Sequence, residues 1–126
     1  MTVEDRAILD QIDALDGPGF ERFLADVFAR LGYRVEQTEF YDRAADLILV
    51  GDRGRVVVKA NRPADPVPER AVQAAVAAKA VYGCEHALVV TNSTFTPRAE
   101  RLAQANQVDL WGRDRLISQS RSARRP

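Results

Sequence analysis

The stretch that decides the fold runs from Asp42 to Arg62 and reads DRAADLILVGDRGRVVVKANR. It contains two apolar runs separated by Gly51–Gly54, whose two glycines and Asp favour a tight turn. Two apolar runs joined by so short a turn are typical of an antiparallel hairpin. The sequence therefore predicts neighbouring antiparallel strands at Asp46–Val50 and Arg55–Asn61.

The predicted hairpin carries polar residues at the ends of its two apolar strands. Asp46 opens the first strand, and Lys59 and Asn61 close the second. Because the strands are antiparallel, we expect the hairpin to bring Asp46 and Lys59 together. Carboxylates and a lysine on neighbouring strand ends suit metal-dependent phosphodiester hydrolysis, in which carboxylates hold Mg²⁺ and the lysine faces the phosphate.

Outward from the hairpin, apolar periodicity and glycine or proline breaks predict the remaining elements. They are helices at Val3–Leu15, Phe20–Leu31, Val67–Tyr82 and Pro97–Ala105, strands at Tyr33–Gln37, His86–Thr91 and Val108–Trp111, and a helical turn at Gly112–Ile117. The continuous apolar strand His86–Thr91 is typical of a central parallel strand. The order α-α-β-β-β-α-β-α-β predicts an α/β fold with a mixed five-stranded sheet and helices on both faces.

Length and composition suit one compact domain with a real core. The chain has 126 residues, of which 46% are hydrophobic. We expect residues 1–118 to form a single domain with a core at about 17–116, and the basic, Ser-rich segment 119–126 to be a disordered tail.

Net charge and cysteine content bear on nucleic-acid binding and on the cellular compartment. The 18 basic and 18 acidic residues cancel, so nucleic-acid binding would need a local patch of charge. The single cysteine, Cys84, allows no intrachain disulfide and favours a reduced, cytoplasmic location. No run of about 18 apolar residues is present, so we expect no membrane association.

Beyond these patterns, the chain resembles the Mrr-type restriction endonuclease domain of the PD-(D/E)xK nuclease superfamily. The likeness runs from Gly17 to Leu116 and is carried by GPGFERFLADVFARLGYRV, DRAADLILV, RVVVKANR, VQAAVAAKAVYGCEHALVVTNSTFTPRAERLA and VDLWGRDRL. The resemblance implies a restriction-endonuclease-like three-layer sandwich, DNA as partner, and Mg²⁺ as cofactor if the site is active. Nuclease domains of this type often act as dimers that cut both strands, so the resemblance is compatible with a homodimer.

The strand after the turn departs from the pattern that the resemblance implies. Aligned without gaps, Asp46 falls on the metal-binding Asp, Lys59 on the Gln/Glu position and Asn61 on the lysine position. The chain thus reads Lys-Ala-Asn where the family has Gln-x-Lys. A cation now stands where a metal ligand belongs, and Asn61 supplies no positive charge.

Two interpretations of this departure stay open. In one, Lys59 takes the phosphate-facing role, while Asp46, Glu21 and, as a further candidate, Asp42 hold the metal. Alternation along the strand allows this, because Lys59 and Asn61 share a face. In the other, cleavage is lost, and Lys59 pairs with Asp46 and fills the metal position. We favour the second, because a lysine at the ligand position pairs readily with the neighbouring Asp46, and a buried lysine needs such a partner. Glu21 lies beside the apolar stripe of its helix, where a solvated charge is the commoner role.

Three functional hypotheses follow. The chain is a DNA-binding domain with a degenerate, impaired phosphodiesterase site, or an active Mg²⁺-dependent endonuclease using the displaced Lys59, or a protein-interaction domain that keeps only the fold. Gln73 lies on the helix after the site strand, where members of the family often place a polar residue facing the site. An exposed helical glutamine explains Gln73 equally well.

Overall fold

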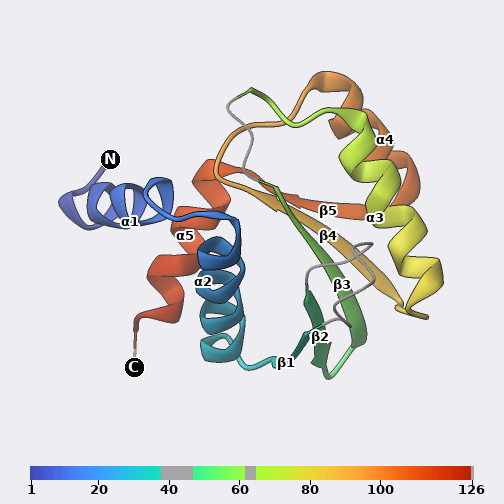
Figure 1. Cartoon of the computed structure of the whole chain (residues 1–126), viewed down its shortest axis with the longest axis horizontal. Coiled ribbons are helices and arrows are strands. Elements are labelled where there is room, and N and C mark those ends of the chain that lie inside the picture. The colour runs from blue at the N-terminus through green and yellow to red at the C-terminus, as the bar shows by residue number, and fades with distance from the viewer. Residues whose placement is uncertain (38–46, 62–64, 126) are drawn as a thin grey trace.

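A five-stranded mixed sheet forms the centre of the computed structural model, which describes residues 1–37, 47–61 and 65–125 (Figure 1). The strands lie side by side in chain order, as β1 (Arg34–Gln37), β2 (Leu47–Gly51), β3 (Gly54–Asn61), β4 (His86–Thr91) and β5 (Val108–Trp111). The pairs β1–β2 and β2–β3 are antiparallel, whereas β3–β4 and β4–β5 are parallel. The mixed sheet and the antiparallel hairpin predicted from the sequence are therefore confirmed.

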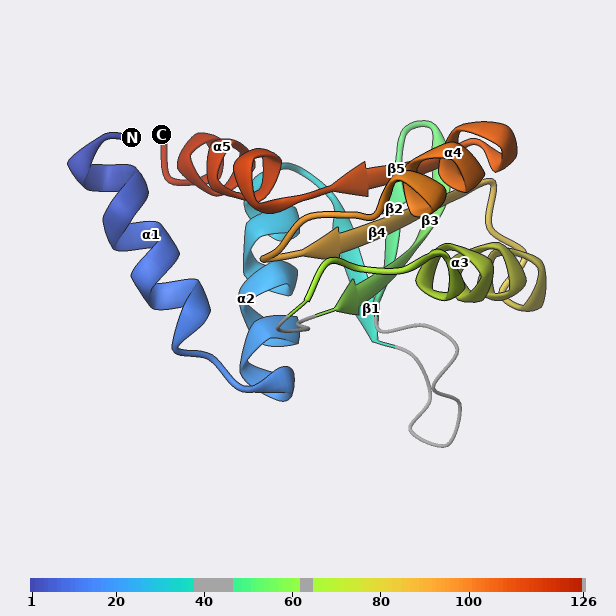
Figure 2. The ribbon, with the colours of Figure 1, turned by 90° about the horizontal axis from the view of Figure 1, so that it is seen from above.

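Helices cover both faces of this sheet, as Figures 1 and 2 show from two directions. They are α1 (Val3–Asp13), α2 (Gly17–Arg30) and α5 (Arg113–Ala123) on one side, and α3 (Glu69–Val81) and α4 (Pro97–Asn106) on the other. The three-layer arrangement is thus confirmed. None of the described helices has the length and apolar character needed to cross a bilayer.

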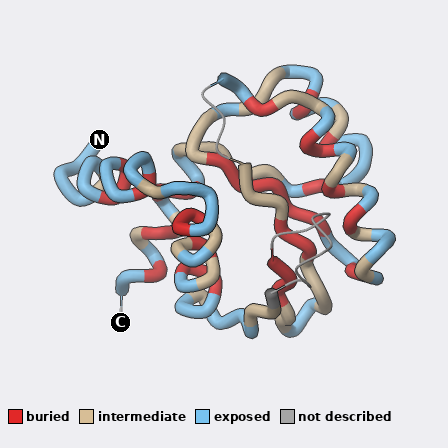
Figure 3. The backbone as a smooth tube through the Cα atoms, in the orientation of Figure 1, coloured by how far each residue is buried: buried red, intermediate tan, exposed pale blue. Residues whose placement is uncertain are grey.

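Alternate residues of β3 belong to two separate cores. Val57 packs with Ile48 and with residues of α3 and α4, whereas Val58 packs with Leu47 and with residues of α1, α2 and α5. Figure 3 shows the buried positions concentrated along the sheet and on the helix sides turned toward it. Since side chains alternate along a strand, positions 59 and 61 share the face of Val57.

Three predicted helix boundaries shift by two residues or more, one of them because of a contact distant in sequence. Helix α2 begins at Gly17 rather than at Phe20, because Asp16 caps it and Pro18 suits its first turn. The helix expected from Val67 begins at Glu69, because Val67 forms an isolated parallel bridge with Phe95. The Val67 amide donates to the carbonyl of Thr94 over 2.8 Å, which holds the segment extended. The first helix ends at Asp13, two residues earlier than the periodicity predicts.

The expected disorder of segment 119–126 is also wrong over most of its length. Helix α5 continues to Ala123, and both Ser120 and Ala123 are buried. Arg121 forms an ion pair with Asp5 of α1, which the local composition of the tail gives no means of predicting. Packing against α1 therefore stabilises a helix that a basic, Ser-rich sequence does not favour by itself.

The turn between β2 and β3 is closed by a carboxylate from another part of the chain. Gly54 has a φ of +110°, and a Cβ added there would lie 2.8 Å from the Glu85 carboxylate. Glu85 accepts a hydrogen bond of 2.7 Å from the Arg55 amide. That hydrogen bond, with one from its own amide, lowers the pKa of Glu85.

We expect Glu85→Gln to destabilise the protein at neutral pH and to lose this effect in acid. Because the folded-state pKa lies below the ordinary value of 4.5, the carboxylate's contribution is present above that value and is lost as pH falls through the folded pKa. Urea denaturation of both proteins from about pH 7 to about pH 3 measures the difference in unfolding free energy. A difference that does not change with pH would contradict this role of the charge.

Candidate functional site

The candidate site begins where β3 ends. In the parallel ladder with β4, Lys59 pairs with Val89 and Asn61 pairs with Thr91. Lys59 and Asn61 are both half-buried, and both lie on the sheet face that packs against α3 and α4. The structure thus brings these two predicted residues together on one surface at the carboxyl end of the strand.

Asp46, the predicted metal-binding acid, and Asp42 lie outside the described residues. The first described residue of β2 is Leu47, which pairs with Val58 in the antiparallel ladder. Val58 is the residue immediately before Lys59 in the chain. The expected proximity of Asp46 and Lys59 therefore stays a prediction.

Glu21 lies on the opposite side of the sheet from Lys59 and Asn61, whereas Gln73 lies on α3, the helix that packs on their side. Glu21 is half-buried on α2, and α2 packs on the opposite face of the sheet. Gln73 is exposed on α3, while its neighbour Val72 is buried. The metal role of Glu21 and the site role of Gln73 stay predictions.

The described residues do not by themselves fit a metal ion. Within residues 1–37, 47–61 and 65–125, no group of three or more His, Cys, Asp or Glu side chains could hold one. His86 is exposed, with its Nε2 3.3 Å from the Arg53 carbonyl. Cys84 is buried, and desolvation raises the pKa of its thiol. Both therefore fit structural roles rather than ligand roles.

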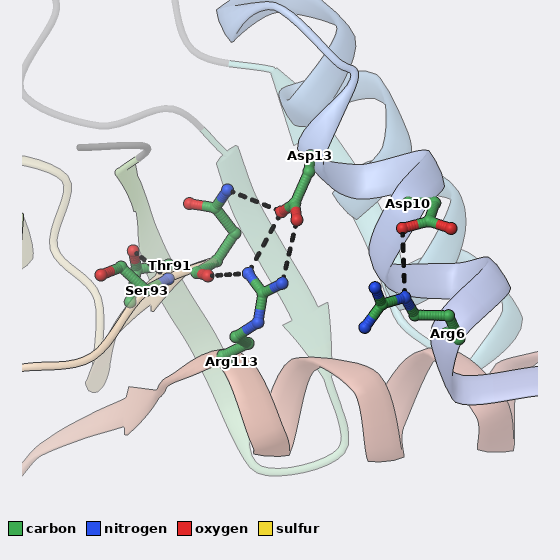
Figure 4. A network of polar contacts seen from close by, with 7 residues as sticks. Arg6, Asp10, Asp13, Thr91, Ser93 and Arg113 are labelled. Carbon is green, nitrogen blue, oxygen red and sulfur yellow. Dashed lines mark hydrogen bonds and ion pairs between the residues drawn. The ribbon is translucent and has the colours of Figure 1, made fainter. Parts of the chain in front are cut away.

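A polar network that the sequence did not indicate lies at the same end of the sheet (Figure 4). Arg113, at the start of α5, donates from its two terminal nitrogens to the two carboxylate oxygens of Asp13, over 3.2 and 2.9 Å. The guanidinium also donates to the carbonyl of Asn92 over 2.8 Å, and the Asn92 amide nitrogen donates to Asp13 over 3.2 Å. The network links α1, α5 and the residue that follows β4.

Part of this network could have been predicted from topology. Asn92 follows β4 and Arg113 comes two residues after β5, and these strands are parallel. Since the carboxyl ends of parallel strands meet at one edge, side chains just beyond them gather there. Asp13 comes from a helix distant in sequence, and no local pattern indicates its contact with Arg113.

Comparison with known proteins gives the family of the chain. A family model described as restriction endonuclease, Mrr_cat, matches residues 12–119. No curated protein sequence matches the chain.

Several solved structures share the fold at low sequence identity. The DNA modification-dependent restriction endonuclease AspBHI has a TM-score of 0.73 at 19% identity, over 98% of this chain and 36% of that one. The restriction endonuclease MspJI, in complex with a 27-mer oligonucleotide, has a TM-score of 0.62 at 20% identity, over 91% of this chain and 30% of that one. A protein of unknown function has a TM-score of 0.63 at 16% identity, over 73% of this chain and 55% of that one.

The chain thus spans between 30% and 55% of the length of these structures. Their likeness concerns the fold, whereas the sequence match at residues 12–119 covers most of the chain. The mixed sheet, the helices on both its faces and this match agree. The chain belongs to the Mrr-type restriction endonuclease family.

Proposed function

We propose that this chain is a DNA-directed module of the restriction endonuclease fold whose metal site is degenerate and whose cleavage is impaired. The observation that carries the proposal is the position of Lys59 on β3. Lys59 stands two residues before Asn61, on the same face, where the family pattern has a metal ligand followed by a lysine. A cation in the ligand position repels Mg²⁺, which restriction endonuclease domains typically use.

Support for DNA as the partner comes from the fold. MspJI shares the architecture and was solved with an oligonucleotide, and AspBHI is a DNA modification-dependent endonuclease. This chain spans about a third of either protein. We therefore infer that this domain has a surface that faces DNA. We further infer that recognition of the target sequence is carried out by other parts of such proteins.

The pairing of Lys59 with Asp46 completes the proposed site. A half-buried ammonium needs an opposite charge, since burial of an uncompensated charge is costly. Asp46 precedes Leu47, whose ladder partner Val58 precedes Lys59. We infer that Lys59 pairs with Asp46 and takes the place of the metal.

One observation favours a second candidate, an active Mg²⁺-dependent endonuclease that uses the displaced Lys59. Lys59 shares its face with Asn61 and is only half-buried, so its ammonium can reach a phosphate there. Glu21 gives this second candidate less support, because its helix α2 packs on the opposite face of the sheet from Lys59. A cytoplasmic location and a homodimer belong to the proposal in either case.

Binding of a fluorescently labelled DNA duplex tests the DNA-directed role. We expect anisotropy to rise on titration with the protein at low salt without metal, and the affinity to fall as salt increases, because phosphate contacts release counterions. Absence of binding at the lowest salt would contradict the proposal and would leave a role in protein interaction. A denatured sample of the same chain controls for adsorption.

A further inference from the structure

The contact between Asp13 and Arg113 joins an N-terminal helix to the edge of the candidate site. The family match begins at residue 12, so nearly all of α1 lies before it. Arg113 starts α5, and its backbone amide donates to the Ser93 carbonyl over 2.8 Å. Its guanidinium is held beside Asn92, directly after β4, whose last pair is Asn61 with Thr91.

The two helices are complementary in charge. Helix α1 carries four acids and one arginine, and the segment 113–125 carries five arginines and one acid. Side chains of these arginines contact α1 at three places, which are Arg113 to Asp13, Arg121 to Asp5 and Arg124 to Gln11. An acidic helix therefore covers arginines that could otherwise contact a polyanion.

Helix α1 is anchored independently of Asp13. Ile8 and Ile12 are fully buried in the core below it. A second anchor is the charged Asp5, which accepts hydrogen bonds from Thr2 and from Arg121 of α5. Desolvation raises the pKa of Asp5, but these hydrogen bonds outweigh it, so the pKa is lowered and the carboxylate stays charged. A change at Asp13 alone is thus expected to leave α1 docked.

The contact between Asp13 and Arg113 is open to competition. The side chains of Arg113 and Asp13 are 36% and 41% exposed, so solvent and salt ions reach the pair and screen it. The planar fork of a guanidinium binds phosphate and carboxylate with the same donors. The hydrogen bond to the Asn92 carbonyl keeps the fork at the sheet end when the carboxylate is withdrawn.

We propose that Arg113 is a phosphate-contacting residue at the edge of the site, a role that rests on the DNA-directed function above. In this proposal, the carboxylate of Asp13 on α1 competes with DNA phosphate for the Arg113 guanidinium, which we call the reserve role of Arg113. The carboxylate of Asp13 occupies the donors that a DNA phosphate would use. When the Asp13 charge is lost, the Arg113 guanidinium is free to bind one more DNA phosphate.

Duplex binding by Asp13→Asn, measured against salt, tests this role, with Asp10→Asn as its matched control. Asp10 lies on the same helix, and its salt bridge at 3.7 Å is to Arg6 of that helix (Figure 4). Both variants remove one negative charge from α1, but only Asp13→Asn releases Arg113. We expect Asp13→Asn to steepen the slope of log affinity against log salt by about 0.9. Between about 50 and 200 mM salt, its affinity is then expected to fall about 3.5-fold more than that of the native chain.

The double variant Asp13→Asn/Arg113→Gln is expected to lose the extra slope. Equal slopes for Asp13→Asn and Asp10→Asn, with the native chain binding DNA, would overturn the reserve role of Arg113 and leave the proposed function intact. Binding by none of the proteins at low salt would overturn both. Far-UV circular dichroism and the urea midpoint of each variant are expected to match those of the native chain, which shows that the helix content and stability are kept.

Discussion

The double variant Lys59→Gln/Asn61→Lys is expected to bind Mg²⁺ about a thousandfold more tightly than the native chain. The change restores the Gln-x-Lys order of the family on β3. Two unit charges about 4 Å apart at an effective dielectric of about 20 repel by about 4 kcal/mol, and the repulsion from divalent Mg²⁺ is about twice that. The double variant moves the lysine charge from position 59 to position 61, so we expect it to recover about half of this repulsion, about 4 kcal/mol. Each 1.4 kcal/mol is about tenfold in affinity, and calorimetric titration with Mg²⁺ measures the difference.

The matched control for this gain is Lys79→Gln. Lys59 and Lys79 are the two lysines of the chain, and Lys79 lies in the last turn of α3, at the far end of that helix from its start after β3. The control makes the same chemical change away from the site and is expected to bind no more Mg²⁺ than the native chain. Adding Asp46→Ala to the double variant is expected to abolish the gain. A double variant without Mg²⁺ affinity would contradict the assignment of positions 59 and 61 to the ligand and the lysine.

Phe28→Ala is expected to cause a large loss of stability, of about 3–5 kcal/mol. Phe28 is 1% exposed on α2, and its ring centroid lies 5.0 Å from that of Trp111 on β5 and 6.0 Å from that of Tyr33. Its removal leaves a cavity between α2 and the sheet and also breaks two aromatic contacts. Urea denaturation at neutral pH measures the change in unfolding free energy.

Phe23→Ala is the matched control for Phe28→Ala. Phe23 lies on the same helix but is only partly buried against the same core. The same truncation is therefore expected to cost less than half as much, because less apolar surface leaves contact and the site opens to water. Equal losses for the two variants would contradict the larger contribution assigned to Phe28.

The central hairpin was predictable because its signals are local. The Gly51–Gly54 turn and the flanking apolar runs fix an antiparallel pair, and the register that follows places Lys59 and Asn61 on one face. The parallel position of β4 was predictable because its apolar run needs burial on both faces. The placement of Lys59 and Asn61 on one face of this strand could thus be predicted from the sequence.

The contacts of helix α5 depend on segments that are distant in sequence. The basic composition of the last residues predicts disorder, yet Ser120 is buried against the helix layer and Arg121 pairs with Asp5. The contact between Asp13 and Arg113 joins residues 100 positions apart. Such pairs arise from the packing of α1 on α5, which depends on tertiary geometry rather than on local periodicity.

Incubation of supercoiled plasmid with the chain and Mg²⁺ or Mn²⁺ tests the degenerate site most directly. Asp46→Ala serves as the control, because it removes the one acid that every active reading of the site requires. We expect the native chain to leave the plasmid supercoiled under conditions in which it binds DNA, as the control does. Nicking or linearisation by the native chain that Asp46→Ala abolishes would contradict this expectation and would establish an active endonuclease.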